Sequence, residues 1–271
     1  MSRHAVEITD LTKTFGGRRK LFGRQASEVR AVRGISLALE RGETLGIVGE
    51  SGSGKSTLAR MLAGLERPSS GIMLIDGKPW EQLAAKGASA FGRTIQYVFQ
   101  DPVASLNPRK TIDEILDVPL RLLCGYDHTR RASRKKELLD AVQMPLGTLE
   151  RFPHEFSGGQ AQRIAIARAL AAEASILILD EPVSALDVSV QAQVLLLLQQ
   201  LRDDLGLTYL FISHDLAVVE SISDRVAVMY LGEIVEAGPA ARLFAEPQHD
   251  YTRTLIASAP RLAIRKPHEP A

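Results

Sequence analysis

The stretch LGIVGESGSGKST, residues 45–57, decides how the rest of the chain is interpreted. A short apolar run is followed by a glycine-rich loop whose residues are Gly49, Glu50, Ser51, Gly52, Ser53, Gly54, Lys55, Ser56 and Thr57. Its spacing is the pattern G-x-x-x-x-G-K-[ST], in which glycines let successive backbone N–H groups turn toward phosphate oxygens. The stretch therefore predicts a strand, a phosphate-binding loop and a helix that begins near Lys55.

Two side chains of this loop have the chemistry that a bound nucleoside triphosphate requires. We expect Lys55 to lie on the β- and γ-phosphates and the Ser56 hydroxyl to be a ligand of Mg²⁺. The helix dipole at the same point also favours an anion. The alternative is a flexible Gly/Ser loop, but the amphipathic run over residues 58–64 favours a helix and hence the phosphate loop.

The composition is that of an ordinary globular protein. The chain has 271 residues, a net charge of +1 and 45% hydrophobic residues, enough for one large domain or two small ones. One cysteine, Cys124, excludes an internal disulfide framework and a four-cysteine metal site, and we interpret it as a small buried hydrophobe. No apolar signal segment or membrane-spanning run is present, so we expect a cytoplasmic protein.

Apolar runs alternate with helical periodicity and predict an α/β domain with a parallel sheet. Strands are expected at 6–11, 35–39, 44–48, 72–75, 95–99, 176–179 and 208–212, with a hairpin over 226–237. Helices are expected at 160–172, 188–205 and 216–222, and short terminal ones near 243 and 251–259. Residues 103–172 have helical periodicity only, so we interpret them as a helical insertion. The basic segment 16–25 is expected to be an exposed loop, and 265–271 a frayed tail.

Two acids follow the apolar run 176–179, at the expected end of a buried strand. Asp180 would hold Mg²⁺ directly or through water, and Glu181 would polarise the attacking water as general base. Two solvated acids at a strand terminus are the alternative, and the phosphate loop upstream makes that reading less favoured. A metal and a base near a triphosphate predict hydrolysis.

Three further positions complete the candidate chemistry. His214 follows another expected strand, where it would contact a γ-phosphate or, alternatively, cap the next helix. Gln100, also after a strand, would contact water or the metal. The segment Ser157–Gln160 precedes a helix, where a hydroxyl and glycine N–H groups predict either a second anion site or an ordinary N-cap.

Taken together, these motifs resemble the ATPase subunits of ABC transporters. The loop 49–57, Gln100, Ser157–Gln160, the strand 176–181, the segment 184–187 and His214 resemble the Walker A, Q-loop, signature, Walker B, D-loop and H-loop. The resemblance implies a P-loop NTPase fold: a RecA-like core at about 1–102 and 173–240, an antiparallel β subdomain, and a helical subdomain at about 103–172. A C-terminal extension at about 241–262 and a flexible tail at 263–271 would complete an ATPase domain of residues 1–262.

In that family two ATPases pack head to tail, which the resemblance implies here as well. ATP with Mg²⁺ would bind to one subunit's phosphate loop and to the partner's Ser157, Gly158, Gly159, Gln160 and Asp187. Phe15 matches the aromatic residue that stacks on adenine, although core packing at a strand end is an alternative.

Narrower segments are similar to oligopeptide and dipeptide importer ATPases, in particular to the second of their two paired ATPases. These are the N-terminal basic loop before Val32 and the segments 99–109, 153–159, 181–187 and 247–252. Asp250 stands where the group usually has proline, and Phe156 where leucine is commoner. The resemblance implies a second ATPase, two membrane permease subunits and, indirectly, an extracytoplasmic solute-binding protein as partners. It places the chain at the cytoplasmic face of the inner membrane.

Two alternatives to peptide import are consistent with the same residues. The same subunit type would energise uptake of nickel chelates or opine-like solutes. A non-transport ABC ATPase acting on nucleic acid is less favoured, because the chain has no long coiled coil and no strongly basic domain. The basic clusters Arg130–Arg131 and Arg134–Lys136 are interpreted as a solvated helix face, or as contacts with lipid head groups.

Overall fold

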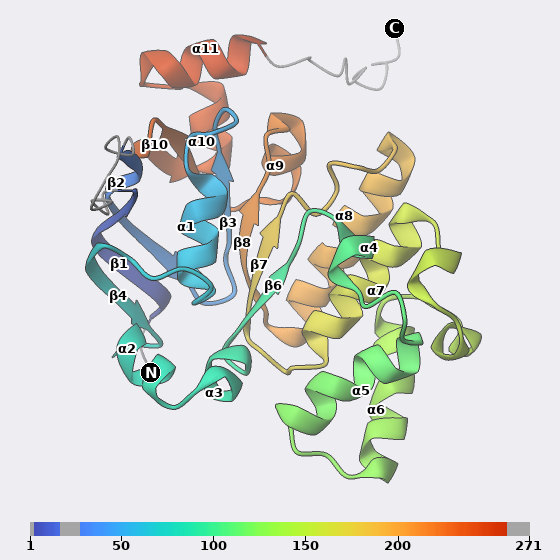
Figure 1. The fold of residues 1–271 in the computed structure, drawn as a ribbon. Coiled ribbons are helices and arrows are strands. Elements are labelled where there is room, and N and C mark those ends of the chain that lie inside the picture. The colour runs from blue at the N-terminus through green and yellow to red at the C-terminus, as the bar shows by residue number, and fades with distance from the viewer. Residues whose placement is uncertain (1–2, 17–27, 259–271) are drawn as a thin grey trace, which may run out of the picture.

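The structure is a computed structural model, and it describes residues 3–16 and 28–258. Most of the basic segment 16–25 and the whole tail 263–271 lie outside the described residues. Figure 1 shows two sheets on either side of the helix α1 (Lys55–Leu62), with a group of helices on the far side of the larger sheet.

The larger sheet is the expected parallel one. Its strand order is β10-β9-β3-β8-β7-β6, and only β10 runs antiparallel to its neighbour among the six. The strands are β3 (Thr44–Val48), β6 (Ile95–Val98), β7 (Ile176–Asp180), β8 (Thr208–Ile212), β9 (Arg225–Tyr230) and β10 (Glu233–Pro239). Every residue of β3, β7 and β8 is buried, as expected for short apolar strands covered on both faces.

The smaller sheet is antiparallel, with the strand order β2-β1-β4-β5. Its strands are β1 (His4–Phe15), β2 (Val29–Glu40), β4 (Ser70–Ile75) and β5 (Lys78–Pro79). The strands β1 and β2 are longer than expected, because register shifts break the side-chain alternation that marks a strand in sequence. Leu58 and Met61 of α1 fill the core between the two sheets, so the helix after the phosphate loop is fixed on both sides.

The segment between β6 and β7 is helical, as its periodicity predicted. It contains α4 (Pro102–Ser105), α5 (Ile112–Leu122), α6 (His128–Ala141), α7 (Gly158–Leu170) and the 3₁₀ turns η1 (Leu146–Glu150) and η2 (Pro153–Glu155). A capping box between Thr111 and Glu114 begins α5. Since α7 packs against the end of the larger sheet through Ile164 and Ile166, these helices share one core with that sheet.

The remaining helices follow β5, alternate with the last strands of the larger sheet, or end the described part of the chain. They are α2 (Trp80–Ala85), α3 (Ala88–Gly92), α8 (Val188–Leu205), α9 (Leu216–Ile222), α10 (Ala240–Ala245) and α11 (Asp250–Ser258). The helix α11 begins at Asp250, where an acid in the first turn is as acceptable as the proline usual in the group. In the part of the chain that the structure describes, no helix is long and apolar enough to cross a membrane.

The interpretation of 130–136 as a solvated face is wrong for two of its residues. Lys135 is 7% exposed, and its Nζ atom lies 2.6 Å from Asp113 and 3.3 Å from Asp117. Arg131 also binds Asp117, at 2.8 Å. Helical spacing alone does not distinguish the buried basic residues of α6 from the exposed ones, because the acids that pair with the buried ones lie on α5. Lys136 is exposed, as expected.

Candidate functional site

The phosphate loop lies between β3 and α1, at the carboxyl edge of the larger sheet. Gly54 is the N-cap of α1 and has a φ of 107°, and a Cβ atom there would lie 2.2 Å from the Ala31 carbonyl oxygen. A Cβ atom on Gly49 would lie 2.1 Å from the Met229 carbonyl oxygen. The glycines are thus required both by the turn and by the backbone that packs against it, as the spacing predicted.

Lys55 is held inside this loop by the loop's own carbonyl groups. Its side chain is buried, and Nζ donates hydrogen bonds to the carbonyl oxygens of Gly49 at 2.7 Å and Glu50 at 2.8 Å. Burial lowers the pKa of Lys55, against the attraction of the carboxylates of Glu181, Asp180 and Glu50. The ammonium group is therefore held within the phosphate loop by two of the loop's carbonyl oxygens.

Ser56 and Asp180 lie together, as expected of two ligands of one metal. The Ser56 hydroxyl donates to Oδ1 of Asp180 at 3.2 Å. A hydroxyl and a carboxylate are the hard oxygen donors that Mg²⁺ prefers, and a nucleotide-bound Mg²⁺ needs few protein ligands because phosphates and water supply the rest. The donor set therefore fits Mg²⁺. Gln100, the third candidate metal ligand, contacts Glu181 instead of these two residues.

Tyr97 is a site residue that the sequence reasoning missed. Its hydroxyl donates to Oδ2 of Asp180 at 2.5 Å, from the neighbouring strand β6. Burial and the bond to Asp180 both raise the pKa of Tyr97, so the phenol keeps its proton and remains a donor. A usable signal existed, since a buried tyrosine hydroxyl normally has a hydrogen-bond partner.

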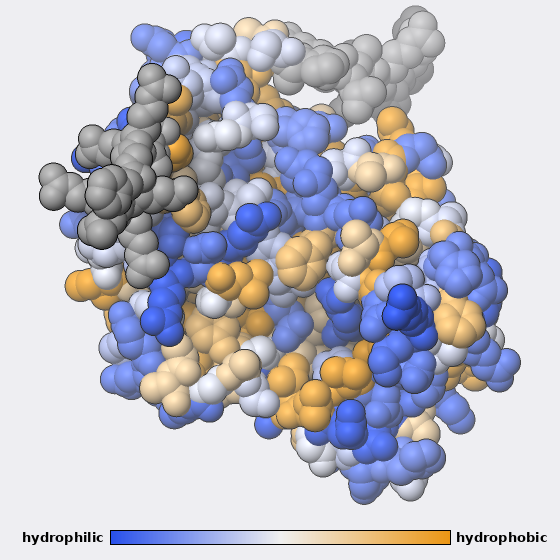
Figure 2. All heavy atoms as spheres, viewed as in Figure 1, coloured by the Kyte–Doolittle hydropathy of each residue, from blue (hydrophilic) through white to orange (hydrophobic). Residues whose placement is uncertain are grey.

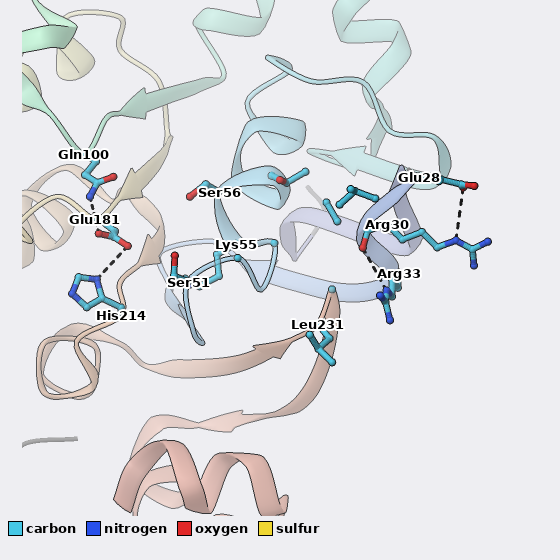
Figure 3. A pocket seen from close by; sticks show the side chains of 16 residues that line it. Glu28, Arg30, Arg33, Ser51, Lys55, Ser56, Gln100, Glu181, His214 and Leu231 are labelled. Carbon is cyan, nitrogen blue, oxygen red and sulfur yellow. Dashed lines mark hydrogen bonds and ion pairs between the residues drawn. The ribbon is translucent and has the colours of Figure 1, made fainter. Parts of the chain in front are cut away.

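Glu181 receives contacts from two other strand ends. Its Oε2 atom accepts a hydrogen bond from Gln100 Nε2 at 3.0 Å, and its Oε1 atom lies 3.2 Å from His214 Nδ1. The backbone of Glu181 has a φ of 50°, and its N–H binds the Ile212 carbonyl oxygen at 2.9 Å. Figure 3 shows Gln100, Glu181 and His214 side by side, opposite Lys55 and Ser51 of the loop. The three candidate catalytic residues therefore meet at one place.

These groups line one cavity of about 800 Å³, a size that accommodates a nucleotide. Its lining residues are Glu28, Val29, Arg30, Ala31, Arg33, Ser51, Gly52, Gly54, Lys55, Ser56, Thr57, Gln100, Glu181, His214, Leu231 and Gly232. The sequence gives no indication that Arg30, Arg33 and Leu231 belong to this cavity, because strand β2 and the β9–β10 hairpin contain no recognisable phosphate-binding motif. Figure 3 places them at the end of the cavity away from Glu181.

Phe15 is not one of the described residues that line this cavity. It ends β1 opposite Val29, which does line the cavity, and 39% of Phe15 is exposed. Lys13 Nζ lies 4.8 Å from the ring centroid. The ring is therefore beside the cavity and largely outside the core, so adenine stacking stays a prediction.

The signature segment forms an N-cap. The Ser157 hydroxyl accepts a hydrogen bond from the Gln160 N–H at 3.4 Å, and the Gln160 side chain accepts one from the Ser157 N–H at 3.1 Å. Gly159 is buried, and a Cβ atom there would lie 2.3 Å from Val190 Cγ1 on α8. Gly158 is exposed. Among the described residues, the cavity lining contains none from 157–160, so this segment is separate from the phosphate loop of its own chain, and its binding of an anion stays a prediction.

The helices α8 and α9 each begin at an aspartate cap. Asp187 caps α8 by accepting hydrogen bonds from the Val190 N–H and the Ser189 hydroxyl, and these bonds lower its pKa. His214 does not cap α9, because the cap is the neighbouring Asp215. The alternative reading of His214 as a helix cap is therefore wrong.

A loop of this shape, with an acid pair at the next-but-one strand and a helical insertion, defines a P-loop ATPase of the cassette type. Residues 32–184 match the ABC transporter family, and the chain belongs to that family. Residues 235–270 match the family described as oligopeptide/dipeptide transporter, C-terminal region. The chain is accordingly an ATP-hydrolysing subunit of an ABC transporter, and the predicted family resemblance is confirmed.

Named relatives cover nearly the whole chain. The oligopeptide transport ATP-binding protein AppF of Bacillus subtilis is 49% identical over 94% of this chain and 78% of its own length. The dipeptide transport ATP-binding protein DppF of Haemophilus influenzae is 46% identical over 93% of this chain and 77% of its own.

Solved structures confirm the predicted ABC-ATPase fold. A dimeric ATP-binding cassette in a post-hydrolysis state with ADP and Pi has a TM-score of 0.75 and 29% identity, covering 87% of this chain and 98% of that one. A component of the transporter complex cbiONQ from Clostridium perfringens has a TM-score of 0.77 and 28% identity, covering 90% and 92% of the two chains.

Proposed function

We propose that this chain energises the uptake of peptides through a membrane permease, with ATP bound between two cassettes that pack head to tail. The observation that supports the cassette mechanism is the separation of the two candidate anion-binding segments in one chain. Lys55, Glu181 and His214 line one cavity, while Ser157 at the start of α7 does not. A second copy or a related subunit would bring its own Ser157 segment to the open side of that cavity.

Within one cavity each residue has a separate task. Lys55 and the loop N–H groups would bind the β- and γ-phosphates, and Ser56 and Asp180 would hold Mg²⁺. Bound there, the ion would neutralise charge on the phosphate oxygens. Tyr97 would keep the Asp180 carboxylate aimed at Ser56 through its hydrogen bond.

The proposed general base is Glu181. Its carboxylate would accept a proton from the attacking water, while Gln100 and His214 hold its two oxygens in place. The His214 ring, 59% exposed, would also be free to reach a γ-phosphate. Gln100 directly precedes the helical segment, which begins with α4. A shift of that segment would therefore move Gln100 and change the orientation of the Glu181 carboxylate.

Across the proposed dimer, the Ser157 hydroxyl and the N–H groups at the start of α7 would contact the partner's γ-phosphate. Asp187 is the N-cap of α8, and Val190 of the same helix packs on Gly159. The two segments expected to contact the partner's ATP therefore pack directly against each other. ATP would then favour the closed dimer because only that state completes the site.

An apolar groove supplies a candidate site for the permease. It has a volume of about 510 Å³ and lies between the segment that follows α1 and the helices α3 and α5, where Phe99, Val118 and Leu122 are exposed. Figure 2 shows hydrophobic side chains gathered on this part of the surface. Phe99 directly precedes Gln100, so a helix of a permease seated here would act on the residue that contacts Glu181. Docking there would give the chain a peripheral position at the inner membrane.

The peptide substrate is inferred from the relatives named above and from the C-terminal match. The test is transport by a complete complex in liposomes, which contains this chain, a permease pair, a second ATPase and a solute-binding protein. Labelled di- and oligopeptides should accumulate with ATP and fail to accumulate with a Glu181→Gln subunit. Accumulation of nickel chelates without peptides would contradict peptide uptake, and stimulation of ATP hydrolysis by DNA would contradict the transport role.

A further inference from the structure

The C-terminal helix α11 contacts the beginning of the phosphate loop. The Glu50 backbone N–H donates a hydrogen bond to the Tyr251 hydroxyl at 3.1 Å. The two residues are 201 positions apart in the chain. In Figure 1, α11 lies over the same end of β3 and α1 that the loop connects. A segment outside the motif-bearing core thus reaches the candidate nucleotide site.

The ring of Tyr251 is fixed by a second tyrosine. Its centroid lies 4.1 Å from that of Tyr230, with an angle of 32° between the planes. Tyr230 ends β9, which is the direct neighbour of β3 in the sheet, with Val48 opposite Val228. The ring pair therefore places the Tyr251 hydroxyl relative to the strand from which the loop departs.

The turn before α11 is held by side chains on both sides. The Glu236 carboxylate accepts hydrogen bonds from the N–H groups of Gln248 at 2.9 Å and His249 at 3.0 Å. Arg253 donates to the Pro247 carbonyl oxygen at 3.1 Å and binds Asp250 at 2.6 Å. These contacts leave the first turn of α11 little freedom, so Tyr251 is presented in one orientation.

Glu50 is where this contact meets the chemistry of the loop. Tyr251 binds the N–H of Glu50, and the carbonyl oxygen of the same residue accepts from Lys55 Nζ at 2.8 Å and from the Ser53 N–H at 3.2 Å. The rest of the loop is anchored by the hairpin, where the Gly232 N–H binds the Ser53 carbonyl oxygen at 2.9 Å. The orientation of the Glu50 backbone therefore affects the position of the Lys55 ammonium group.

We propose that Tyr251 is a positioning residue for nucleotide binding, by which the C-terminal helix holds the phosphate loop in its binding shape. The proposal rests on the proposed role of Lys55 and its loop in binding ATP. Without the hydroxyl, the Glu50 N–H loses this partner and the loop start is ordered only when ATP binds. The free-energy cost of that ordering should lower the affinity for ATP. Tyr251 does not line the cavity that contains Glu181, so the chemical step should be unchanged.

The test compares Tyr251→Phe with a matched control, Tyr230→Phe, in the full chain. Both keep the ring pair, but only the first removes the hydroxyl that accepts from Glu50. For Tyr251→Phe we expect fluorescent mant-ATP to bind about 3- to 10-fold more weakly, as for loss of one neutral hydrogen bond. KM for ATP should rise by a similar factor with kcat nearly unchanged. Tyr230→Phe should match the wild type in both.

Amide hydrogen exchange supplies a readout that a general loss of stability would not give. Without nucleotide, peptides containing Glu50 should exchange faster in Tyr251→Phe, while peptides from α7 and α8 should be unchanged. Equal affinity and equal exchange at Glu50 in both variants would overturn the proposal, as would a lowered melting temperature with no change in affinity.

A Lys55→Ala variant separates this proposal from the assignment of the site itself. If Lys55→Ala loses mant-ATP binding and Tyr251→Phe does not change it, the loop binds ATP and the role of Tyr251 is wrong. If Lys55→Ala binds ATP normally, the assigned phosphate site is wrong, and the role of Tyr251 in it is wrong as well.

Discussion

Nδ1 of His214 lies 3.2 Å from Oε1 of Glu181, although the two residues follow different strands. Since β7 and β8 are parallel neighbours, their carboxyl ends deliver both side chains to one edge of the sheet. Gln100 reaches the other oxygen of the same carboxylate from β6. Three adjacent strands thus fix the orientation of one candidate base.

Replacing Glu181 by glutamine should stop hydrolysis while leaving ATP binding intact. The amide has the shape of the carboxylate but cannot accept the proton of the attacking water, so kcat should fall by about 10²- to 10⁴-fold. Size-exclusion chromatography with ATP should show a persistent dimer. Near wild-type turnover in the assembled complex would show that another group is the base.

The neighbours of Glu181 should matter less than Glu181 and should depend on one another. Gln100→Ala and His214→Ala each remove one contact to the carboxylate, and we expect about a 10-fold lower kcat for each, as for loss of one charge-assisted hydrogen bond. Combined with Glu181→Gln, either change should have a much smaller effect than it has alone. Fully additive losses would mean that the two residues act independently of the carboxylate.

The phosphate loop could be predicted from sequence because its function depends on residues within one short segment. The spacing of Gly49, Gly54 and Lys55 is sufficient to assign their roles. In the structure both glycines have the positive φ values that the motif requires. The acids Asp180 and Glu181 could be predicted in the same way, because they stand directly after a buried apolar run that marks a strand.

Contacts that join distant segments could not be predicted in this way. Tyr97 lies in an ordinary apolar strand, and its bond to Asp180 exists because β6 and β7 are neighbours in the sheet. The local sequence places Lys135 on a solvated face, because its partners on α5 are 18 and 22 positions away. The missing information is in both cases the pairing of elements, which no local pattern of residue types contains.

The buried pairing of α5 and α6 should appear in stability and in its pH dependence. Lys135→Ala leaves Asp113 and Asp117 without their shared cation, and we expect the free energy of unfolding to fall by about 1–3 kcal/mol. Lys136→Ala, at an exposed neighbouring position, is the control and should stay within about 0.5 kcal/mol of the wild type. Urea unfolding monitored by circular dichroism measures both.

The pH dependence arises from Asp117. Burial opposes ionisation, but the bonds from Arg131 and Lys135 outweigh it and hold the pKa of Asp117 below its ordinary 3.8. A carboxyl group whose pKa is lower in the folded state stabilises the folded protein at pH values above its ordinary pKa. That stabilisation is lost as the pH falls from the ordinary pKa through the lower folded-state pKa. The wild type should therefore lose stability more steeply than Asp117→Asn as the pH falls below about 4. Equal pH profiles would contradict the assignment.

A negative charge introduced at position 157 should test whether the signature segment contacts the partner's ATP. Asparagine and aspartate both cap helices well, so Ser157→Asn and Ser157→Asp should both keep the start of α7. Only aspartate places a negative charge where the proposed γ-phosphate would lie, and repulsion should abolish turnover there. Because each chain keeps its own phosphate loop, binding of mant-ATP to the isolated Ser157→Asp chain should be unchanged.

Mixed dimers of two differently tagged copies then locate the affected site. In a head-to-tail dimer, a Lys55→Ala chain paired with a Ser157→Asp chain retains one intact site, formed by Lys55 of the second and Ser157 of the first. That pair should hydrolyse ATP. A chain carrying both changes, paired with a wild-type chain, has no intact site and should be inactive. If Ser157 instead acted on its own chain's ATP, the separated changes would give no activity and the combined changes would leave the wild-type site working, so the two arrangements give opposite results.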